Sequence, residues 1–134
     1  MTGWQRFTAA AGSRVQIVGD DLLTTNAKRV AEAATEHLCN AALIKPNQSG
    51  TVTEAHAALE AAKRASLATI VSARSGESED VSIAHLAVGW NAGQIKVGSF
   101  ARSERMAKWN ELIRIEEALG SNARYAGPGA LHGR

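Results

Sequence analysis

The sequence predicts an α/β fold built from four consecutive strand–helix units with parallel strands. Three observations support this prediction: short β-branched or aliphatic runs recur, each is followed by a stretch with helical periodicity, and their spacing is nearly constant. Val18, Ile44, Ile70 and Ile95 mark the four runs at intervals of 26, 26 and 25 residues. One strand, one helix and two short loops fill such an interval, so the chain is expected to repeat one βα unit four times.

The strands are expected where the four runs occur. Parallel strands joined by helices have right-handed crossovers, so all four should point the same way and end at one rim. Half of a (β/α)8 barrel and a flat, doubly wound sheet both satisfy this pattern. The runs are VQIV at 15–18, AALI at 41–44, ATIV at 68–71 and QIKV at 94–97.

The first two helices have recognisable starts. Thr25 or Asn26 can cap the first, because either side chain can accept a hydrogen bond from a free backbone N–H of the first turn. Thr51 and Glu54 form a capping-box pattern at the start of the second, in which each side chain satisfies a backbone donor of the other residue.

The last two helices are predicted from caps and apolar stripes. Asp80 is the expected cap of a helix over about 81–91, and Ser103 of one over about 104–119 that Gly120 would end. The last helix carries two apolar stripes, which predicts that it is buried on more than one side.

Composition excludes several classes of protein. The 134 residues, 45% of them hydrophobic, suit one cytoplasmic domain, and no run approaches the roughly 18 to 20 apolar residues of a membrane span. The single Cys39 cannot form an internal disulfide and is expected to be buried and inert. A net charge of +2 is too small to indicate nucleic acid binding, and the cluster of Arg102, Arg105 and Lys108 is expected to form a solvated helix face.

Chemically active side chains follow each predicted strand. They are Asp20 and Asp21 after the first, Lys45 after the second, residues 72–75 after the third and Lys96 on the fourth. The carboxyl ends of parallel strands share one rim, where barrel and doubly wound folds bind their ligands. These side chains are therefore expected to lie close together at this rim.

This set of side chains suits an anionic substrate and a divalent cation. Either carboxylate can ligate Mg²⁺, and Lys45 or Lys96, held near another cation, can act as a base at neutral pH. Arg74 offers a two-pronged contact to phosphate or carboxylate, and Ser75 with Gly76 adds donors. The spacing leaves open the alternative that these groups form structural ion pairs at the strand ends.

Five segments, in order, resemble the C-terminal part of the enolase family, the phosphopyruvate hydratases of glycolysis. The resemblance runs from Gly3 to Gly127, and five ordered motifs are unlikely to match by chance. The segments are VQIVGDDLLTTNAKR at 15–29, LIKPNQSGTVTEA at 43–55, VSARSGESED at 71–80, AGQIKVGSFARSER at 92–105 and ELIRIEEALG at 111–120.

The resemblance implies the C-terminal half of an enolase-type (β/α)8 TIM barrel over residues 1–127, followed by a flexible tail at 128–134. The implied activity is that of a lyase that dehydrates 2-phosphoglycerate to phosphoenolpyruvate with Mg²⁺. The implied ligand is therefore a small phosphorylated anion.

Site residues follow from the same resemblance. It implies that Asp20 binds Mg²⁺ and that Lys45 is the base that removes the proton next to the substrate carboxylate. Arg74 and Ser75 would hold the phosphate, and Lys96 the carboxylate side of the substrate. A Lys base with Mg²⁺ also agrees with how this superfamily stabilises an ene-diolate.

The sequence departs from the family pattern in two respects. Ala73 stands where family members carry a histidine, so the anion loop lacks one polar contact. The family's two further carboxylate ligands and its general-acid glutamate precede this segment, and the sequence holds no counterpart of them. The chain alone is therefore expected to bind Mg²⁺ weakly or not at all and to be inactive.

Two functions remain as hypotheses. One is a split enolase subunit or lyase relic whose missing acids come from another polypeptide. The other is a non-catalytic interaction or regulatory module derived from enolase. Because a half-barrel leaves two sheet edges unpaired, we expect a homodimer or association with another enolase-like chain, and no nucleic acid or membrane partner.

Overall fold

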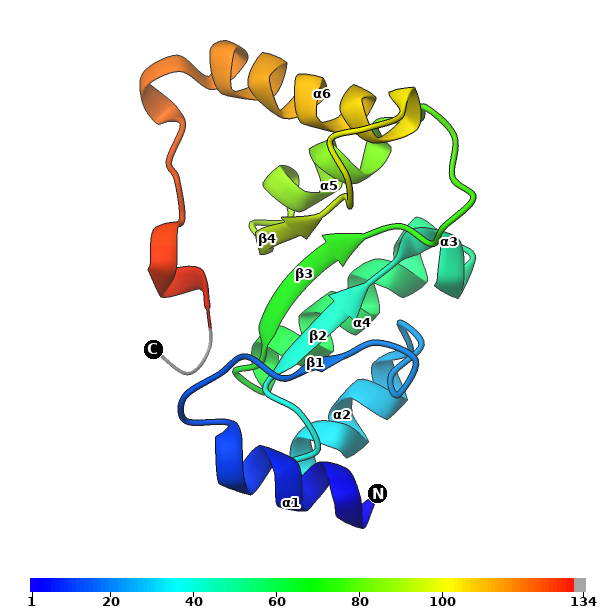
Figure 1. Cartoon of the computed structure of the whole chain (residues 1–134), viewed down its shortest axis with the longest axis vertical. Coiled ribbons are helices and arrows are strands. Elements are labelled where there is room, and N and C mark those ends of the chain that lie inside the picture. Colours follow the sequence, from blue (N-terminus) through cyan, green and yellow to red (C-terminus); the bar gives the residue numbers. More distant parts are fainter. Residues whose placement is uncertain (132–134) are drawn as a thin grey trace.

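Four parallel strands form a single sheet whose spatial order follows the sequence (Figure 1). The computed structural model describes residues 1–131; the last three residues of the predicted tail, including His132, lie outside this range. The predicted alternation of four parallel strands with helices is confirmed. The strands are β1 (Val18–Gly19), β2 (Ala41–Ile44), β3 (Ala68–Ser72) and β4 (Gly93–Lys96).

The helices connect and flank these strands. They are α1 (Thr2–Ala11), α2 (Ala27–Thr35), α3 (Pro46–Ser49), α4 (Val52–Arg64), α5 (Ser82–Gly89) and α6 (Ser103–Leu119), with 3-10 turns η1 (Gly120–Asn122) and η2 (Gly127–Ala130). None of the helices within residues 1–131 is long and apolar enough to cross a membrane.

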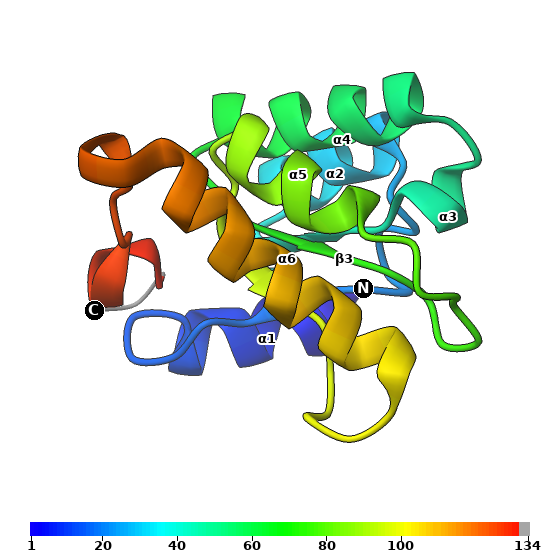
Figure 2. The same ribbon diagram turned by 90° about the horizontal axis from the view of Figure 1, so that it is seen from above.

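The strand order and the placement of the helices are those of a (β/α) barrel and not of a doubly wound sheet. Helices α2, α4 and α5 lie along one side of the sheet (Figure 2). Right-handed crossovers that each move one strand further in the same direction place their helices on one face. A doubly wound sheet reverses its strand order and carries helices on both faces, so the flat alternative is wrong.

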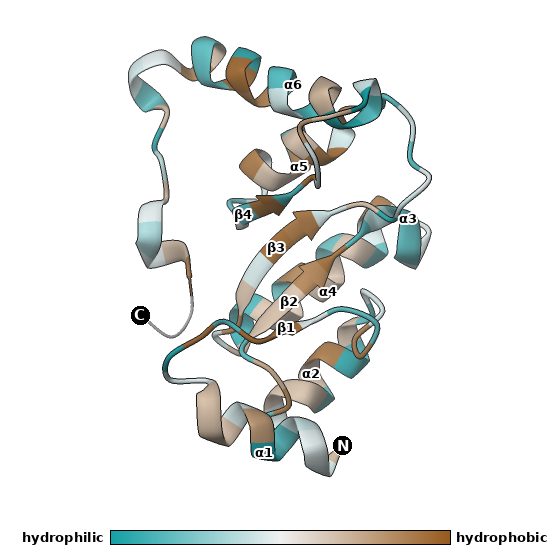
Figure 3. Cartoon of the chain, in the orientation of Figure 1, coloured by the Kyte–Doolittle hydropathy of each residue, from teal (hydrophilic) through white to brown (hydrophobic). Residues whose placement is uncertain are grey.

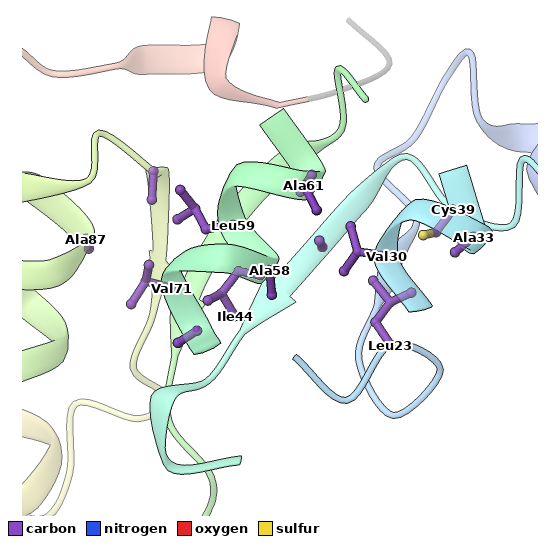
Figure 4. Packing of buried hydrophobic residues seen from close by; sticks show 14 of the residues in the cluster. Leu23, Val30, Ala33, Cys39, Ile44, Ala58, Leu59, Ala61, Val71 and Ala87 are labelled. Carbon is purple, nitrogen blue, oxygen red and sulfur yellow. The ribbon is translucent and has the colours of Figure 1, made fainter. Parts of the chain in front are cut away.

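Side chains alternate between the two faces of the sheet along each strand. Ala42, Ile44 and Val71 face the helices and join one hydrophobic cluster with Leu59 of α4 (Figure 4). Colouring by hydropathy shows apolar segments toward the carboxyl ends of β2 and β3 and mixed polar and apolar residues along α6 (Figure 3). The core therefore lies between the sheet and its helices. The other face, called the inner face below, carries the buried Leu43 and Ile70, and polar side chains lie toward the strand ends.

Cys39 belongs to this core and is buried, as predicted. Burial raises the pKa of the thiol above its ordinary value, and hydrogen bonds at the backbone of Gly19 and Ala41 partly oppose the shift. A thiol with a raised pKa holds little thiolate at neutral pH, so it is a poor nucleophile.

The predicted caps of the first two connecting helices are confirmed with one difference. The Asn26 side chain accepts hydrogen bonds from the backbone N–H groups of Lys28 and Arg29, both at 3.1 Å. Thr51 Oγ1 accepts from Glu54 N at 3.1 Å. The Glu54 carboxylate, however, accepts from the Thr51 hydroxyl at 2.8 Å and not from its backbone N–H, so only half of the capping box forms.

Helices α5 and α6 differ from expectation in length and burial. Asp80 Oδ1 accepts from Ser82 N at 2.8 Å, but α5 is shorter than the predicted helix over 81–91. Helix α6 begins and ends close to the predicted residues, yet the two-sided burial expected of it is wrong. Lys108 is its one buried residue, and Ile113 is 55% exposed. The reason is that, within residues 1–131, α6 makes its main packing contact with one helix, α5.

Asn40, directly before β2, ties the N-terminal segment to the sheet. Its Oδ1 accepts a hydrogen bond from Ile17 N at 2.6 Å, and its Nδ2 donates to the carbonyl oxygens of Gly12 and Val15, each at 3.0 Å. The residue is 6% exposed, so water competes little for these bonds.

The first strand is shorter than predicted, and one helix has no predicted counterpart. The run at 15–18 was expected to be a strand, but the ladder with β2 contains only Val18 and Gly19. At Val15 and Ile17, the Asn40 side chain makes the backbone hydrogen bonds that a neighbouring strand would otherwise make. Helix α1 has no buried residue and carries no periodic core face, which is why sequence pattern does not reveal it.

Replacing Asn40 by Ala should lower the free energy of unfolding by about 2–4 kcal/mol, because it removes three hydrogen bonds and leaves the buried Ile17 N–H without an acceptor. Urea unfolding followed by circular dichroism measures this change. Asn110→Ala, on the exposed side of α6, is the matched control and should change it by less than about 0.5 kcal/mol. Equal effects of both variants would contradict this account of the N-terminal segment.

Candidate functional site

Polar side chains lie on the inner face of the sheet, the face opposite the helices, at the carboxyl ends of the strands. The register pairs Ser72 with Lys96, and it pairs Ile44 with Val71, so Lys45 and Ser72 are neighbours on the opposite face from the core. The same alternation sends Asp20 inward after β1. Asp20, Lys45, Ser72 and Lys96 thus lie at one rim, as the sequence predicted.

Asp20 and Lys45 form the closest pair at this rim. Lys45 Nζ donates to Asp20 Oδ1 at 2.5 Å. The Lys45 side chain is 10% exposed, whereas that of Asp20 is 39% exposed. The carboxylate therefore faces solvent while the ammonium group lies behind it, which fixes where the lysine nitrogen points.

Thr25 fixes the backbone of Lys45. Its Oγ1 accepts a hydrogen bond from Lys45 N at 3.0 Å and donates to Gln48 Oε1 at 2.8 Å. Thr25 is 2% exposed and has a positive φ of 52°, unusual for a β-branched residue. The loop after β1 and the short α3 after Lys45 are thus joined through one buried hydroxyl, and Asn26 rather than Thr25 caps α2.

The sequence offers Thr25 only as a possible helix cap and indicates no role for Asn47 or Gln48. Asn47 Oδ1 accepts from Arg74 N at 3.0 Å and so connects α3 to the loop that follows β3. The only sequence signal was the polar run TTN at 24–26 and the Asn-Gln pair after Pro46. Such runs are common in solvated loops, so neither could be distinguished from ordinary turns.

Arg74, Ser75 and Lys96 present exposed polar groups at the same rim. Within residues 1–131, neither Arg74 nor Lys96 has a carboxylate within ion-pair distance. Ser72 Oγ donates to the carbonyl oxygen of Lys96 at 2.9 Å and anchors the end of β4. Two cations without protein partners beside the Lys45 pair make this rim suitable for an anion.

A complete magnesium site does not fit the described residues. Mg²⁺ prefers six oxygen ligands in near-octahedral geometry, with carboxylates among them. Asp20 is the carboxylate on the inner face at this rim, and its Oδ1 already contacts the Lys45 ammonium. Residues 1–131 contain no group of three His, Cys, Asp or Glu side chains placed to hold a metal ion.

Nearly the whole chain is similar to a known protein family. A family model described as "Enolase, C-terminal TIM barrel domain" matches residues 1–132. The match covers every strand, the rim and both loops that carry the polar side chains.

Asp20→Asn should lower the free energy of unfolding by about 1–2 kcal/mol, because it leaves a largely buried ammonium group without its counter-charge. The partial exposure of Asp20 keeps the loss below that of a fully buried pair. Asp21→Asn, at the exposed neighbouring position, should change the value by less than about 0.5 kcal/mol. Urea titration of both variants distinguishes a structural pair from two independent charges, and an unchanged Asp20→Asn protein would exclude the pair as a stabilising contact.

Proposed function

The chain belongs to the enolase family, and we propose that it is the half of an enolase barrel that supplies the base and the anion-binding residues for dehydrating 2-phosphoglycerate. The observation that carries this proposal is the pairing of a buried lysine, Lys45, with Asp20 at 2.5 Å. The same rim holds Arg74 and Lys96, for which residues 1–131 supply no carboxylate partner. Burying the Lys45 ammonium group carries a desolvation cost that its pairing with Asp20 need not repay in stability.

Lys45 is the proposed base. Its Nζ would take the proton next to the substrate carboxylate, and the resulting negative charge would develop on that carboxylate. The hydroxyl at the neighbouring carbon then has to leave as water, which needs an acid. We propose that this acid comes from outside the described residues.

Arg74, Ser75 and Lys96 are the proposed anion-binding residues. The Arg74 guanidinium can contact two phosphate oxygens at once, and Ser75 can donate a further hydrogen bond. Lys96, at the end of β4, would face the carboxylate side of the substrate. The phosphate would thus be bound on the loop after β3, with the proton to be removed nearer to β2.

Enolases use Mg²⁺, and Asp20 is proposed as one of its ligands in a complete site. One carboxylate shared with a lysine is too little to hold the ion firmly. The proposal therefore requires the other ligands from a complementary barrel half, and it includes no tight Mg²⁺ binding by this chain alone.

The complementary half is also the proposed partner. Strands β1 and β4 each have a neighbour on one side only, so their outer backbone groups are free to pair. Apolar residues of two helices are also exposed, among them Phe7 of α1 and Ile113 of α6, at 54% and 55%. A second copy of the chain or another enolase-like chain would cover both edges.

A binding or regulatory module without catalysis is the second candidate, and Ala73 favours it. An alanine at this position of the anion loop cannot donate a hydrogen bond or transfer a proton. Both candidates require binding of the anion, but only the first requires turnover once a complementary half is present.

Binding of phosphoenolpyruvate is the first test. In low salt, isothermal calorimetry should detect binding that weakens about three- to tenfold in Arg74→Lys, because one ammonium cannot reproduce a two-pronged contact. Arg64→Lys, an exposed arginine at the far end of α4, serves as the control and should bind like the parent chain. Absence of binding to the parent chain would reject both candidate functions and favour structural ion pairs.

Turnover is the second test. The purified chain with 2-phosphoglycerate and Mg²⁺ should form no phosphoenolpyruvate above background, since loss of a general acid alone costs about 10²- to 10⁴-fold. Absorbance of the product measures this, and sedimentation of the same sample records its oligomeric state. Turnover that disappears in Lys45→Ala and persists in Lys28→Ala, an exposed control lysine, would show that the chain is sufficient by itself.

A further inference from the structure

The loop between β3 and α5, residues 73–81, is held by polar contacts at its start, its middle and its end. At its start, Arg74 N donates to Asn47 Oδ1 at 3.0 Å. At its end, Asp80 is hydrogen-bonded to Ser82, which holds the pKa of Asp80 below its ordinary value, with a smaller contribution from the charge of Lys108. The middle of the loop contains Gly76 with φ +81°, a conformation that other residues rarely adopt.

A buried ion cluster holds this middle part. The Glu77 side chain is 6% exposed and lies between two cations of α6: its Oε1 contacts Arg105 Nη1, and its Oε2 is 3.6 Å from Lys108 Nζ. Neither Glu77 oxygen has a hydrogen bond of good geometry within residues 1–131. Charge attraction in a dry environment therefore holds the carboxylate in place.

Lys108 is the most deeply buried member, with a side chain 2% exposed. Its ammonium group donates to the carbonyl oxygen of Ser78 at 2.6 Å and to that of Glu104 at 2.7 Å. The expectation that this helix face is solvated is thus wrong at Lys108. The contact with Ser78 is a direct bond from helix α6 to the backbone of the loop.

Arg105 connects the cluster to the end of β4. Its Nη1 also donates to the carbonyl oxygen of Val97 at 2.6 Å. Gly98, with φ +107°, allows this approach, because a Cβ there would lie 3.3 Å from Arg105 Nη1. Glu77, Arg105 and Lys108 therefore join the loop after β3, the loop after β4 and α6 at one point.

Burying three charges of this kind does not favour stability by itself, since hydrophobic residues of similar size often do as well or better. Glu77 follows Ser75 by two residues in the loop that also carries Arg74, so the cluster attaches this loop to α6 close to the anion-binding residues. From these contacts, and resting on the proposed function, we infer that Glu77, Arg105 and Lys108 are positioning residues that hold loop 73–81 in the shape that presents Arg74 and Ser75 to the anion.

The test uses Lys108→Met and Glu77→Gln, which remove one charge each and keep side-chain size. Lys63→Met is the matched control, because Lys63 Nζ also donates to a backbone carbonyl, that of Trp90 at 2.6 Å, but on α4 away from the rim. The ¹⁵N heteronuclear NOE of the Ser75 and Gly76 amides measures loop order in the free protein, and calorimetry measures the affinity for phosphoenolpyruvate.

Both variants should lower the NOE at Ser75 and Gly76 and weaken phosphoenolpyruvate binding about tenfold or more, while Lys63→Met leaves both unchanged. A purely structural role would lower the unfolding midpoint without changing either readout in the folded state. If Lys108→Met does not fold, Arg105→Gln replaces it, since it removes the positive charge beside Glu77 and shortens the side chain that reaches Val97.

An unchanged NOE in folded variants would overturn the inference, as would a looser loop that binds the anion with undiminished affinity. Failure of the parent chain to bind phosphoenolpyruvate would count against the proposed function instead. In that case the NOE alone decides whether the cluster orders the loop.

Discussion

The alternation of side chains along four parallel strands is the constraint on which both core and rim depend. Each strand gives one set of side chains to the helices and the other to the inner face. Ile44 and Val71 fill the core, and their neighbours Lys45 and Ser72 consequently face the opposite way. A shift of one residue in any strand would exchange these roles, so the packing of the core also fixes which side chains reach the rim.

The inner face is closed at its opposite end by two amides from the edges of the sheet. Gln16 Nε2 donates to Gln94 Oε1 at 2.9 Å, and Gln94 Nε2 donates to Gln16 Oε1 at 3.0 Å. Since Gln16 precedes β1 and Gln94 lies on β4, the sheet must curl enough for side chains from its two edge segments to meet across the inner face. Leu43 and Ile70, which point inward, are accordingly only 2% and 7% exposed. The curvature of a barrel thus persists in four strands.

Polar contacts concentrate where loops meet, and they replace the regular hydrogen bonds that strands and helices make for themselves. Asn40 binds the segment before β1, Thr25 links two rim loops, and Lys108 holds the loop after β3. Each of these groups is almost fully buried. Buried polar groups that are fully bonded specify one arrangement of a loop, because every alternative leaves a donor or acceptor unsatisfied.

The sequence by itself determined the order of the four strand–helix units, the cap at Thr51 and the presence of Lys45 and Lys96 at strand ends, because periodicity and capping are local properties. It left Thr25 and Asn26 as alternative caps, and the structure decided for Asn26. Tertiary structure alone decided that Asn40 replaces part of the first strand, and that Lys108 is buried although its neighbours in sequence suggest a solvated face. The physical reason is distance along the chain. Lys108 is buried because Ser78, 30 residues away, accepts its hydrogen bond, and no local pattern encodes such a partner.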